Sequence, residues 1–490
     1  MMQLTMYIDG KWKNPSKDNK RDIINPANGE VIAEAAEGTA EDAKEAISQA
    51  KRAFQDGEWP EMAPAERAEY LYRIAAKLDE NHDELTRLET LDNGKTHTEA
   101  SFDVTEAADC FRYYAGLIRA PEGQAVDAPE STHTMVVHEP VGVCGLIVPW
   151  NFPLLMSVWK MAPALAAGNT VILKPSEITP VTAVKLFEIF DEAGLPDGVA
   201  NLLLGHGAVV GNELATSHDV DKISFTGGTE TGRAIMKSAA GNLKKISLEL
   251  GGKSPNIVFQ DADLDTAVDH ALFGIYFGAG QVCSSGSRIL VEESIHDVFV
   301  ERFAERAKKI TVGPGSDPAS EMGPLVSEDH MNKVLSYIAK GKEEGANLVC
   351  GGNRVQTGAL KDGYFVEPTA FTDTTETMRI VQEEIFGPVA VFQTFKDEQD
   401  AIRVANNTDY GLAGSVFTQD SAKALRVIKK VRAGITWVNT YHTNFNDFPW
   451  GGYKQSGIGR GLGKYGLEEF QEVKQININL QPEPTGWFSE

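Results

Sequence analysis

The stretch VGVCGLIVP, residues 141–149, opens a series in which short β-branched runs alternate with amphipathic helical patterns. Three further predicted strands follow it along the chain: NTVILKP (169–175), DKISF (221–225) and PNIVF (255–259). Two helical patterns, at 181–194 and 229–241, lie between these runs, and each ends on a glycine. This alternation predicts a parallel sheet covered by helices on both faces, with ligands bound at the carboxyl ends of the strands.

A second alternating series begins downstream of residue 285, in runs such as SRILV, FVEPTAF and VAVFQTF. Upstream, residues 40–118 are predicted to be mostly helical. A chain of 490 residues is long for one hydrophobic core. The sequence therefore predicts two α/β domains joined by short turns.

Composition and charge narrow the class of protein. Hydrophobic residues make up 42% of the chain and charged residues 24%, which is typical of a soluble globular protein. The net charge of -24 repels a phosphate backbone, so nucleic-acid binding is not expected. The N-terminus has no apolar core of secretory length, and the apolar run at 141–150 is about half as long as a membrane span. We expect a cytoplasmic protein that acts on a small molecule and not on a membrane.

The four cysteines, at positions 110, 144, 283 and 350, lie far apart in the sequence. No C-x-x-C motif or Cys/His cluster is present, which argues against zinc and against a disulfide framework, and no metal is expected. Cys283 lies in GQVCSSGSR (280–288), a run of small and polar residues. By this pattern it is either an inert buried thiol or a nucleophile.

Three stretches have features of a nucleotide site. FTGGTETG (225–232) follows a predicted strand and opens a helix, where free amide groups favour a phosphate. Glu177 lies three residues after Lys174 at a strand end, an arrangement in which a carboxylate can accept both ribose hydroxyls of NAD. GHGAVVG (205–211) has one residue too many between its last two glycines for a dinucleotide fingerprint. An ordinary turn or a solvated ion pair remains the alternative for these stretches.

Two strand ends carry candidate catalytic residues. Asn151 in PWNFP lies just beyond a buried strand, and Glu249 in LELGGKSP (248–255) ends another strand before two glycines. An acid after apolar residues is partly desolvated, which raises its pKa and suits a general base. A carboxylate that caps the next turn is the alternative.

Taken together, these stretches resemble the aldehyde dehydrogenase family. The order and rough spacing of that family are matched by PWNFP, KPSE, FTGG, LELGGKSP, GQVC, EEIFGP, PWGGYKQSG and LEEFQEVK, over essentially the whole chain. The resemblance implies an α/β fold with a Rossmann-like cofactor domain, a second α/β catalytic domain and a small β oligomerisation arm. The implied boundaries are 1–119 and 141–252 for the NAD-binding domain, 253–467 for the catalytic domain, and 120–140 and 468–490 for the oligomerisation segment. Because such an arm is prone to pair with another copy, we expect a homodimer or a homotetramer.

By the same resemblance, Cys283 is the nucleophile that attacks an aldehyde, while the Asn151 amide and the Cys283 N–H hold the oxyanion. Hydride transfer to the nicotinamide then leaves a thioester, and Glu249 activates the water that releases the acid. Lys160 is implied to lie near the path of this water and its proton. The implied cofactor is NAD, with NADP as a weaker alternative. The residues implied to bind it are Ile147, Pro149, Trp150, Lys174, Glu177, Gly207, Gly211, Phe225, Thr226, Gly227, Gly228, Leu250, Gly251, Glu384 and Phe386.

Four positions depart from the family pattern. Gly228 stands where serine is frequent, which removes a side-chain contact to phosphate but keeps the amide. Gly461 replaces the glutamate of GRELG, a second carboxylate proposed to relay protons in some members. Ser285 takes a position usually held by a smaller or non-hydroxylated residue. The run NDF before Pro449 does not match the subfamily that the aromatic residues indicate in the next paragraph.

Four aromatic residues match those that line the aldehyde tunnel of the family: Phe152, Trp159, Phe277 and Trp450. A tryptophan cage suits a quaternary ammonium group through cation–π attraction, worth about 0.5 to 2 kcal/mol per good contact. PWGG, WKMAPALAAGN and the terminal WF are similar to bacterial betaine aldehyde dehydrogenases, so we expect oxidation of betaine aldehyde to glycine betaine. The alternative is a broad-specificity enzyme that holds aliphatic or aromatic aldehydes by burial alone.

Two other classes of function fit the resemblance less well. A CoA-acylating enzyme would share Cys283 but would not need Glu249, so release of free acid without CoA would exclude it. A non-catalytic scaffold of the same fold would produce no NADH from any aldehyde, and the presence of Cys283, Glu249 and Asn151 together argues against it.

Overall fold

The computed structural model describes residues 1–488 and contains the four strands predicted from the quoted runs. Three of them, β8 (Val143–Ile147), β9 (Thr170–Lys174) and β11 (Lys222–Thr226), belong to an eight-stranded sheet, the first sheet. Its order is β22 (Gly457–Ile458), β12 (Lys245–Glu249), β11, β8, β9, β10 (Ala200–Leu202), β2 (Met6–Ile8) and β3 (Lys11–Lys13). The strands from β12 to β10 are parallel. At one edge β22 runs antiparallel to β12, and at the other β2 runs antiparallel to both β10 and β3.

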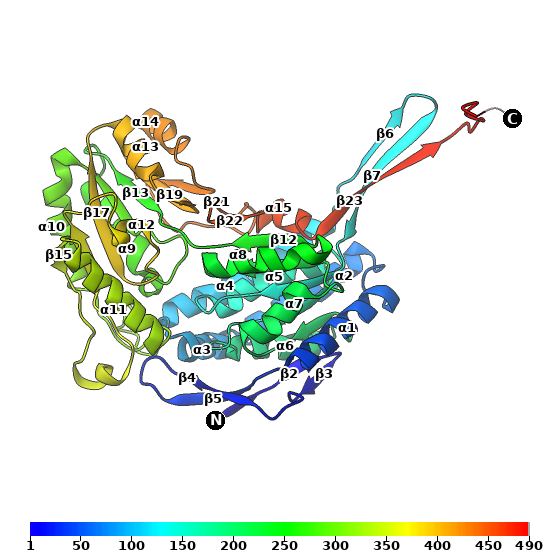
Figure 1. The fold of residues 1–490 in the computed structure, drawn as a ribbon, viewed down its shortest axis with the longest axis horizontal. Coiled ribbons are helices and arrows are strands. Elements are labelled where there is room, and N and C mark those ends of the chain that lie inside the picture. The colour runs from blue at the N-terminus through cyan, green and yellow to red at the C-terminus, as the bar shows by residue number, and fades with distance from the viewer. Residues whose placement is uncertain (489–490) are drawn as a thin grey trace.

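Helices cover both faces of the first sheet (Figure 1). They are α1 (Ala40–Asp56), α2 (Pro64–Glu80), α3 (His82–Asn93), α4 (His97–Ile118), α5 (Pro153–Ala166), α6 (Val181–Glu192), α7 (Asn212–Thr216) and α8 (Thr229–Ser238). The predicted helical region at 40–118 is therefore confirmed as four consecutive helices. Capping boxes begin α1 at Thr39 and α4 at Thr96.

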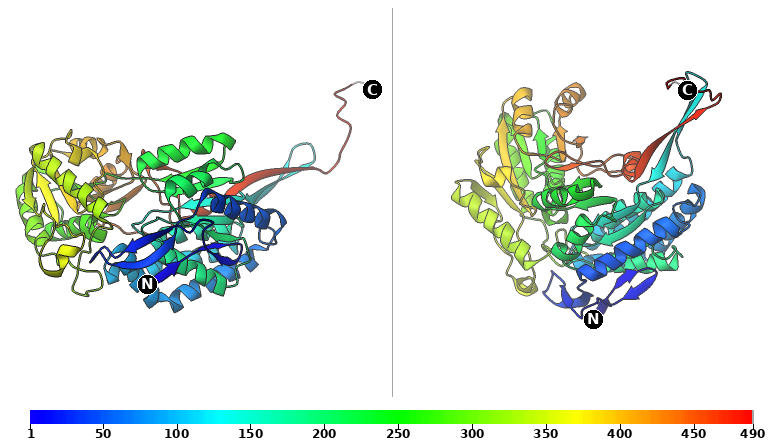
Figure 2. Two further views of the ribbon diagram at one scale, coloured as in Figure 1. Left: turned by 60° about the horizontal axis from the view of Figure 1, so that its bottom comes forward. Right: turned by 45° about the vertical axis from the view of Figure 1, so that its right-hand side comes forward.

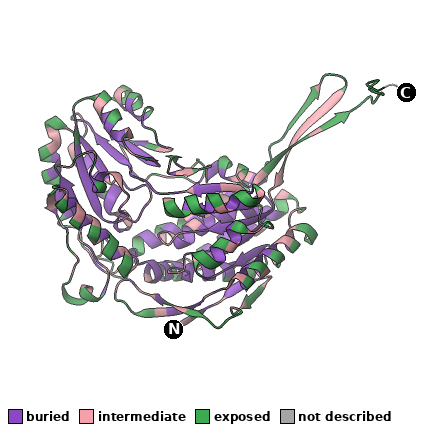
Figure 3. Cartoon of the chain, viewed as in Figure 1, coloured by how far each residue is buried: buried purple, intermediate pink, exposed green. Residues whose placement is uncertain are grey.

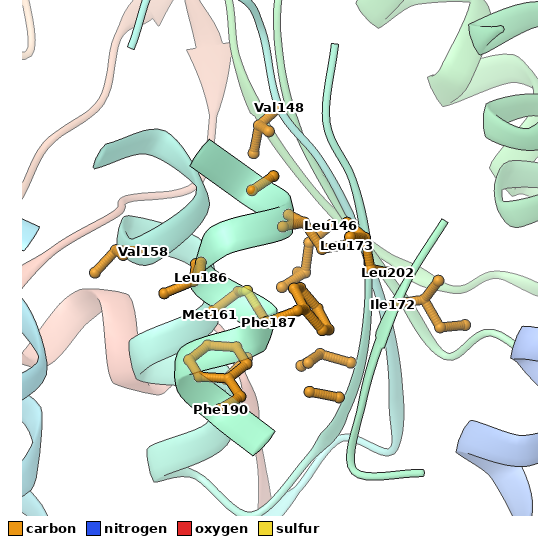
Figure 4. Packing of buried hydrophobic residues seen from close by; sticks show 14 of the residues in the cluster. Leu146, Val148, Val158, Met161, Ile172, Leu173, Leu186, Phe187, Phe190 and Leu202 are labelled. Carbon is orange, nitrogen blue, oxygen red and sulfur yellow. The ribbon is translucent and has the colours of Figure 1, made fainter. Parts of the chain in front are cut away.

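Alternate residues of β9 point to opposite faces of the first sheet, as the pleat of a strand requires. Leu173 is in register with Leu146 of β8, and Figure 4 shows both beside Phe187 of α6, whereas Ile172 points away from them. Thr170, on the same side as Ile172, donates a hydrogen bond to the Ala50 carbonyl of α1 at 2.9 Å. The face of Leu146 thus packs on α5 and α6, and the other face packs on α1.

The fourth predicted strand, β13 (Pro255–Val258), lies in a separate seven-stranded sheet, the second sheet. Its order is β15 (Asn347–Cys350), β16 (Thr369–Thr372), β17 (Val389–Phe395), β14 (Arg288–Glu292), β13, β19 (Ala413–Phe417) and β20 (Ile435–Val438). Its helices are α9 (Leu264–Tyr276), α10 (His296–Ala307), α11 (Glu328–Glu343), α12 (Arg379–Gln382), α13 (Glu398–Asn406) and α14 (Ser421–Ile428). Both sheets have buried strands (purple in Figure 3).

Three strands form an arm that projects from the body of the protein (Figures 1 and 2). They are β6 (Gln124–Ala128), β7 (Thr132–Pro140) and β23 (Gln471–Asn479), with β7 in the middle. The C-terminal segment thus pairs antiparallel with residues far earlier in the chain, from Gln471 opposite Pro140 to Asn479 opposite Thr132. Val126 and Val473 are exposed on this arm. Residues 489–490 of the predicted oligomerisation segment lie outside the described residues.

Smaller elements complete the structure. One small sheet has the order β1 (Met2–Leu4), β5 (Val31–Ala36) and β4 (Lys20–Ile24), and another joins β18 (Tyr410–Gly411) to β21 (Tyr453–Lys454). The last helix is α15 (Gly463–Glu468). Strand β22 comes from the segment predicted as catalytic domain, yet it pairs with β12 at the edge of the first sheet. Within residues 1–488, no helix combines the length and apolar character needed to cross a membrane.

Candidate active site

One cavity of about 1160 Å³ brings together the residues that sequence analysis assigned to catalysis and to the aldehyde. It is lined by Cys283, Glu249, Asn151 and Lys160, and by Phe152, Trp159, Phe277 and Trp450. The predicted cofactor residues that line it are Pro149, Trp150, Thr226, Gly227, Gly228, Leu250, Gly251, Glu384 and Phe386. The others, which are Ile147, Lys174, Glu177, Gly207, Gly211 and Phe225, do not line this cavity.

The backbone around Cys283 is held by close packing. A Cβ atom at Gly252 would collide with the Cys283 carbonyl oxygen, which explains why the second glycine of LELGGKSP is needed there. The Asn151 side chain donates from Nδ2 to the Gln281 carbonyl at 2.8 Å. Because an amide nitrogen carries two hydrogens, the second N–H of Asn151 is left for another acceptor. The Asn151 side chain is thus tied to the loop that carries Cys283, although the two residues lie far apart in the chain.

The Cys283 thiol lies within the protein and borders the cavity. Burial raises the pKa of Cys283 to about 12, and the nearby carboxylates of Glu384 and Glu249 add to this effect. Hydrogen bonds from the backbone N–H groups of Ser284 and Cys283 act in the opposite direction but are weaker. The resting thiol is therefore protonated near neutral pH, and a base must take its proton before it can attack.

Glu249 ends β12 and faces the cavity. Burial raises the pKa of Glu249 well above that of an exposed glutamate, and the Lys160 ammonium opposes this shift. The desolvation expected from the sequence is thereby confirmed. In the described part of the chain, Oε2 of Glu249 is buried without a hydrogen-bond partner. A buried carboxylate with a free oxygen beside a cysteine is suited to accept a proton from water or from the thiol.

The four aromatic side chains form two contacting pairs in the cavity wall. The rings of Trp159 and Trp450 lie 5.4 Å apart at an angle of 61°, and those of Phe152 and Phe277 lie 6.4 Å apart. Trp450 is positioned by two backbone hydrogen bonds of 2.7 Å to Gly461, one in each direction. The wall can therefore present indole faces to a substrate on its way to Cys283.

The predicted ribose-binding pair forms on the α1 side of the first sheet. Lys174 donates to Glu177 at 2.9 Å, and His206 lies 3.8 Å from the other carboxylate oxygen of Glu177. Gly207 begins a π-helix, Gly207–Gly211, and a Cβ there would stand 4.0 Å from the Lys174 amine. Ile147, in register with Lys174, lies on the same side of the sheet. Lys174, Glu177 and His206 thus form a polar cluster on this face of the sheet.

The turn from β11 into α8 leaves room for a close approach to its backbone. A Cβ at Gly228 would meet no atom within 4 Å, whereas one at Gly227 would lie 2.5 Å from the Phe225 ring. The first amide groups of α8 are therefore open to a phosphate. Nearby, Glu384 accepts a hydrogen bond from the Gly252 N–H at 2.8 Å, and Phe386 packs edge-on against Trp150. Backbone amides open to an anion, the Lys174–Glu177 pair and an ordered Glu384 carboxylate are features that suit a dinucleotide.

Known proteins resemble this chain over its whole length. The model of the aldehyde dehydrogenase family matches residues 12–476. The chain belongs to the aldehyde dehydrogenase family. It is 52% identical over 489 residues to a betaine aldehyde dehydrogenase of Bacillus subtilis, with 100% of both chains covered. It is 46% identical over 478 residues to an aldehyde dehydrogenase of Emericella nidulans, covering 97% of this chain and 95% of the other.

A solved structure agrees with the fold of this aldehyde dehydrogenase. The crystal structure of betaine aldehyde dehydrogenase from Staphylococcus aureus in complex with NAD+ superposes with a TM-score of 0.98 at 51% identity. It covers 100% of this chain and 97% of that one. The fold predicted from the sequence, an aldehyde dehydrogenase fold with two α/β units and a β arm, is confirmed.

Several residues that line the cavity of this aldehyde dehydrogenase were not predicted from its sequence. Those near the aromatic wall include Glu99, Phe102, Phe273, His442 and Asn444, and those behind Glu249 are Ser224, Ser247 and Glu469. A sequence signal for the two serines exists in the similar runs KISFT (222–226) and KISLE (245–249). Alternate residues of a strand share a face, so Ser247 lies on the same face as Glu249, and Ser224 has the same place in its own run. Ser285, noted as a departure, does not line the cavity and donates to the Gly280 carbonyl at 3.4 Å.

Proposed function

We propose that this protein oxidises betaine aldehyde to glycine betaine with NAD, through a thiohemiacetal and a thioester on Cys283. The observation that carries the proposal is the aromatic wall, with two tryptophans in contact, in the cavity that also holds Cys283 and Glu249. A tryptophan-rich wall attracts a quaternary ammonium group. Relatives named betaine aldehyde dehydrogenase at 52% and 44% identity support the choice of substrate.

The first bond forms between sulfur and the aldehyde carbon. Glu249 takes the thiol proton, and the Cys283 thiolate attacks the carbonyl carbon. The carbonyl oxygen becomes an oxyanion, which accepts hydrogen bonds from the free N–H of Asn151 and from the backbone N–H of Cys283. When bound, NAD supplies the hydride acceptor that converts this tetrahedral adduct to a thioester. Glu177 would hold the ribose, and the amides at Gly228 would hold the pyrophosphate.

The second half of the reaction returns the enzyme to its starting state. Glu249 takes a proton from a water molecule as the water oxygen attacks the thioester carbon. The carbon–sulfur bond then breaks, the carboxylic acid leaves, and Glu249 gives the proton of the water to the sulfur. The proton that Glu249 took earlier from the thiol must therefore pass from the buried site to solvent in each turnover.

A broad-specificity aldehyde dehydrogenase is the second candidate. The ammonium of Lys95 lies 4.2 Å from the centre of the Phe152 ring, so one face of this wall residue is already engaged by a cation. The cavity also has extensive apolar walls, among them Phe273 and Leu155, which suit uncharged aldehydes.

A steady-state comparison of four aldehydes tests the proposal. Betaine aldehyde, an aminoaldehyde, propanal and benzaldehyde are each assayed with NAD and with NADP. We expect the highest kcat/KM for betaine aldehyde with NAD. Equal kcat/KM for betaine aldehyde and propanal would favour the broad-specificity enzyme. Release of free acid is followed at the same time, because acid release without CoA excludes a CoA-acylating enzyme.

We also propose that the protein is a cytoplasmic homo-oligomer. The arm of β6, β7 and β23 exposes strand edges and apolar side chains, which supports a homodimer or homotetramer. The four cysteines are all free thiols, which suits a reducing compartment such as the cytoplasm. Sedimentation of the purified protein gives the number of subunits, and a monomer would contradict the role of the arm.

A further inference from the structure

Two neighbouring strands of the first sheet carry the same polar alternation. Lys222 and Ser224 alternate along β11, and Ser247 and Glu249 alternate along β12. Ser224 is in register with Ser247 on one side and with Leu146 of β8 on the other. Because residues in register point to the same face of a sheet, these side chains form one polar stripe on the face that α5 covers.

The stripe is hydrogen-bonded to the lysine beside Glu249. Lys160 of α5 donates from Nζ to Ser224 Oγ at 3.0 Å, and Ser247 donates from Oγ to Ser224 Oγ at 3.1 Å. All three residues and Glu249 line the cavity. A hydroxyl group both donates and accepts, and it can rotate, so this chain can pass a proton in either direction.

Glu469 lies at the far end of the stripe. Its carboxylate accepts a hydrogen bond from Lys222 Nζ at 3.0 Å and from the Arg460 N–H at 3.2 Å. A Cβ at Gly459 would stand 2.7 Å from Glu469 Oε1 and 3.1 Å from the Ser247 Cβ, so these two side chains flank the same glycine. The Glu469 side chain is 27% exposed, whereas that of Lys222 is fully buried. Glu469 therefore reaches both the stripe and the solvent.

Gly461 brings no carboxylate to this passage. Gly461 lines the cavity at the position where the family often has glutamate, and a Cβ there would meet only the Trp450 carbonyl, at 3.9 Å. Nothing at Gly461 can accept a proton from Glu249. The proton must leave by another group that borders the same cavity.

We propose that the proton taken up by Glu249 leaves through Lys160, Ser224 and Ser247 to Glu469, which releases it to solvent. The proposal rests on the proposed hydrolysis of a thioester by Glu249. The Glu249 carboxylic acid gives its proton to the neutral Lys160 amine, directly or through cavity water. The resulting ammonium protonates Ser224, which passes its own proton to Ser247. Ser247 in turn protonates the Glu469 carboxylate, so each hydroxyl gains one proton and loses one.

The charges around this passage act on both Lys160 and Glu249. Burial lowers the pKa of Lys160, while the carboxylates of Glu249 and Glu469 raise it and Lys222 lowers it further. The guanidinium of Arg460 and the ammonium of Lys160 lower the pKa of Glu249, whereas Glu469 raises it. Lys160 and Glu249 thus compete for one proton, and the Lys222 ammonium fixes the position of the Glu469 carboxylate at the end of the passage.

The test compares Glu469→Gln with Glu468→Gln, a neighbouring exposed glutamate outside the cavity lining. NADH is followed over the first turnover and in the steady state, from low to high pH. We expect Glu469→Gln to keep the first-turnover burst and to lower the pH-independent steady-state rate by about tenfold, less than the hundredfold or more of a directly transferring group. The negative charge of Glu469 raises the pKa of Glu249, so its removal lowers that pKa. The rising part of the plot of steady-state rate against pH should therefore move to lower pH. If the pH-independent steady-state rate of Glu469→Gln is unchanged and only the rising part of the pH–rate profile moves, the proposed proton route is wrong.

Two further variants test the route if Glu469→Gln does not fold, and one of them tests whether a second carboxylate restores the rate. Ser247→Ala interrupts the chain without disturbing the buried Lys222, and Ser157→Ala, a buried serine of α5 that bonds the Pro153 carbonyl, is its control. We expect the Ser247 variant alone to lower the plateau. Gly461→Glu added to Glu469→Gln places a carboxylate at another point of the cavity lining and should restore the rate at least in part. A Ser247 variant with a normal plateau would contradict the proposed route.

The assay uses whichever aldehyde the wild-type protein oxidises best. If the wild-type protein shows no preference for betaine aldehyde, the proposed substrate is wrong. Comparison of the NADH burst with the steady-state rate in the variants would still decide the proton route.

Discussion

The ammonium of Lys95 lies 4.2 Å from the centre of the Phe152 ring, on a wall of the substrate cavity. Lys95 is buried and pairs with Asp103 and, at 3.7 Å, with Glu89. A ring that already faces one cation has less attraction left for a second. The capacity of the wall to bind a cationic aldehyde therefore resides mainly in Trp159 and Trp450, whose indole rings give the strongest cation–π attraction.

Replacement of Trp450 by alanine should discriminate between cation binding and simple space filling. We expect kcat/KM to fall more for betaine aldehyde than for propanal. The difference between the two losses should be on the order of 1 to 2 kcal/mol, or about five- to thirtyfold. Phe152→Leu is the matched control and should show a smaller differential, because Lys95 engages that ring. An equal loss for both aldehydes in Trp450→Ala would mean that the indole only fills space.

Replacement of Cys283 by alanine should abolish NADH production from every aldehyde while leaving NAD binding near normal, because the thiol is needed only for bond formation. Activity is measured by NADH absorbance and binding by calorimetry. Cys350→Ala, which removes a buried thiol of the second sheet, serves as the control. Appreciable dehydrogenase activity in Cys283→Ala would contradict the mechanism.

Alkylation of Cys283 should report its raised pKa. Since the pKa is raised to about 12 and only the thiolate reacts, the inactivation rate by iodoacetamide should rise with pH, without a plateau, from about pH 7 to 9. The assay is a time course of residual activity in the free enzyme. A plateau reached below neutral pH would indicate a thiolate stabilised in the resting site.

Replacement of Glu249 by glutamine should stall the enzyme after hydride transfer. Glutamine cannot take a proton from water, so thioester should accumulate after a burst of NADH, and turnover should fall by about a hundredfold or more. In the wild type, the rate of acid release should rise as pH passes the raised pKa of Glu249, because only the ionised form is a base. Stopped-flow absorbance measures both phases. If neither the burst nor the loss of rate is seen, Glu249 is not the base.

Replacement of Glu177 by alanine should relax the preference for NAD. The carboxylate would accept hydrogen bonds from the ribose and repel a 2′-phosphate, while Lys174 and His206 beside it remain to pair with that phosphate. We expect the ratio of kcat/KM for NADP over NAD to rise by about tenfold, equivalent to about 1.4 kcal/mol. Glu188→Ala, on the exposed side of α6, is the control. A wild type equally efficient with both cofactors would show that Glu177 does not point at the ribose.

The order of strands and helices could be predicted from the sequence because local patterns encode it. Apolar runs such as 141–149 mark buried strands, and glycines mark the ends of helices. The raised pKa of Glu249 was also foreseeable, since apolar residues precede it in its own strand. The pattern around Cys283 left it open between a buried thiol and a nucleophile until the family resemblance assigned its role.

The contacts among residues far apart in the chain were decided only by the tertiary structure. Lys160 and Ser224 are separated by 64 positions, and Lys222 and Glu469 by 247, so no local pattern relates either pair. Likewise, PNIVF has the same local pattern as the runs before it but lies in the second sheet, because pairing partners are chosen by packing across the whole chain. Sequence patterns determine which face of a strand is polar, whereas packing determines which polar groups meet on it.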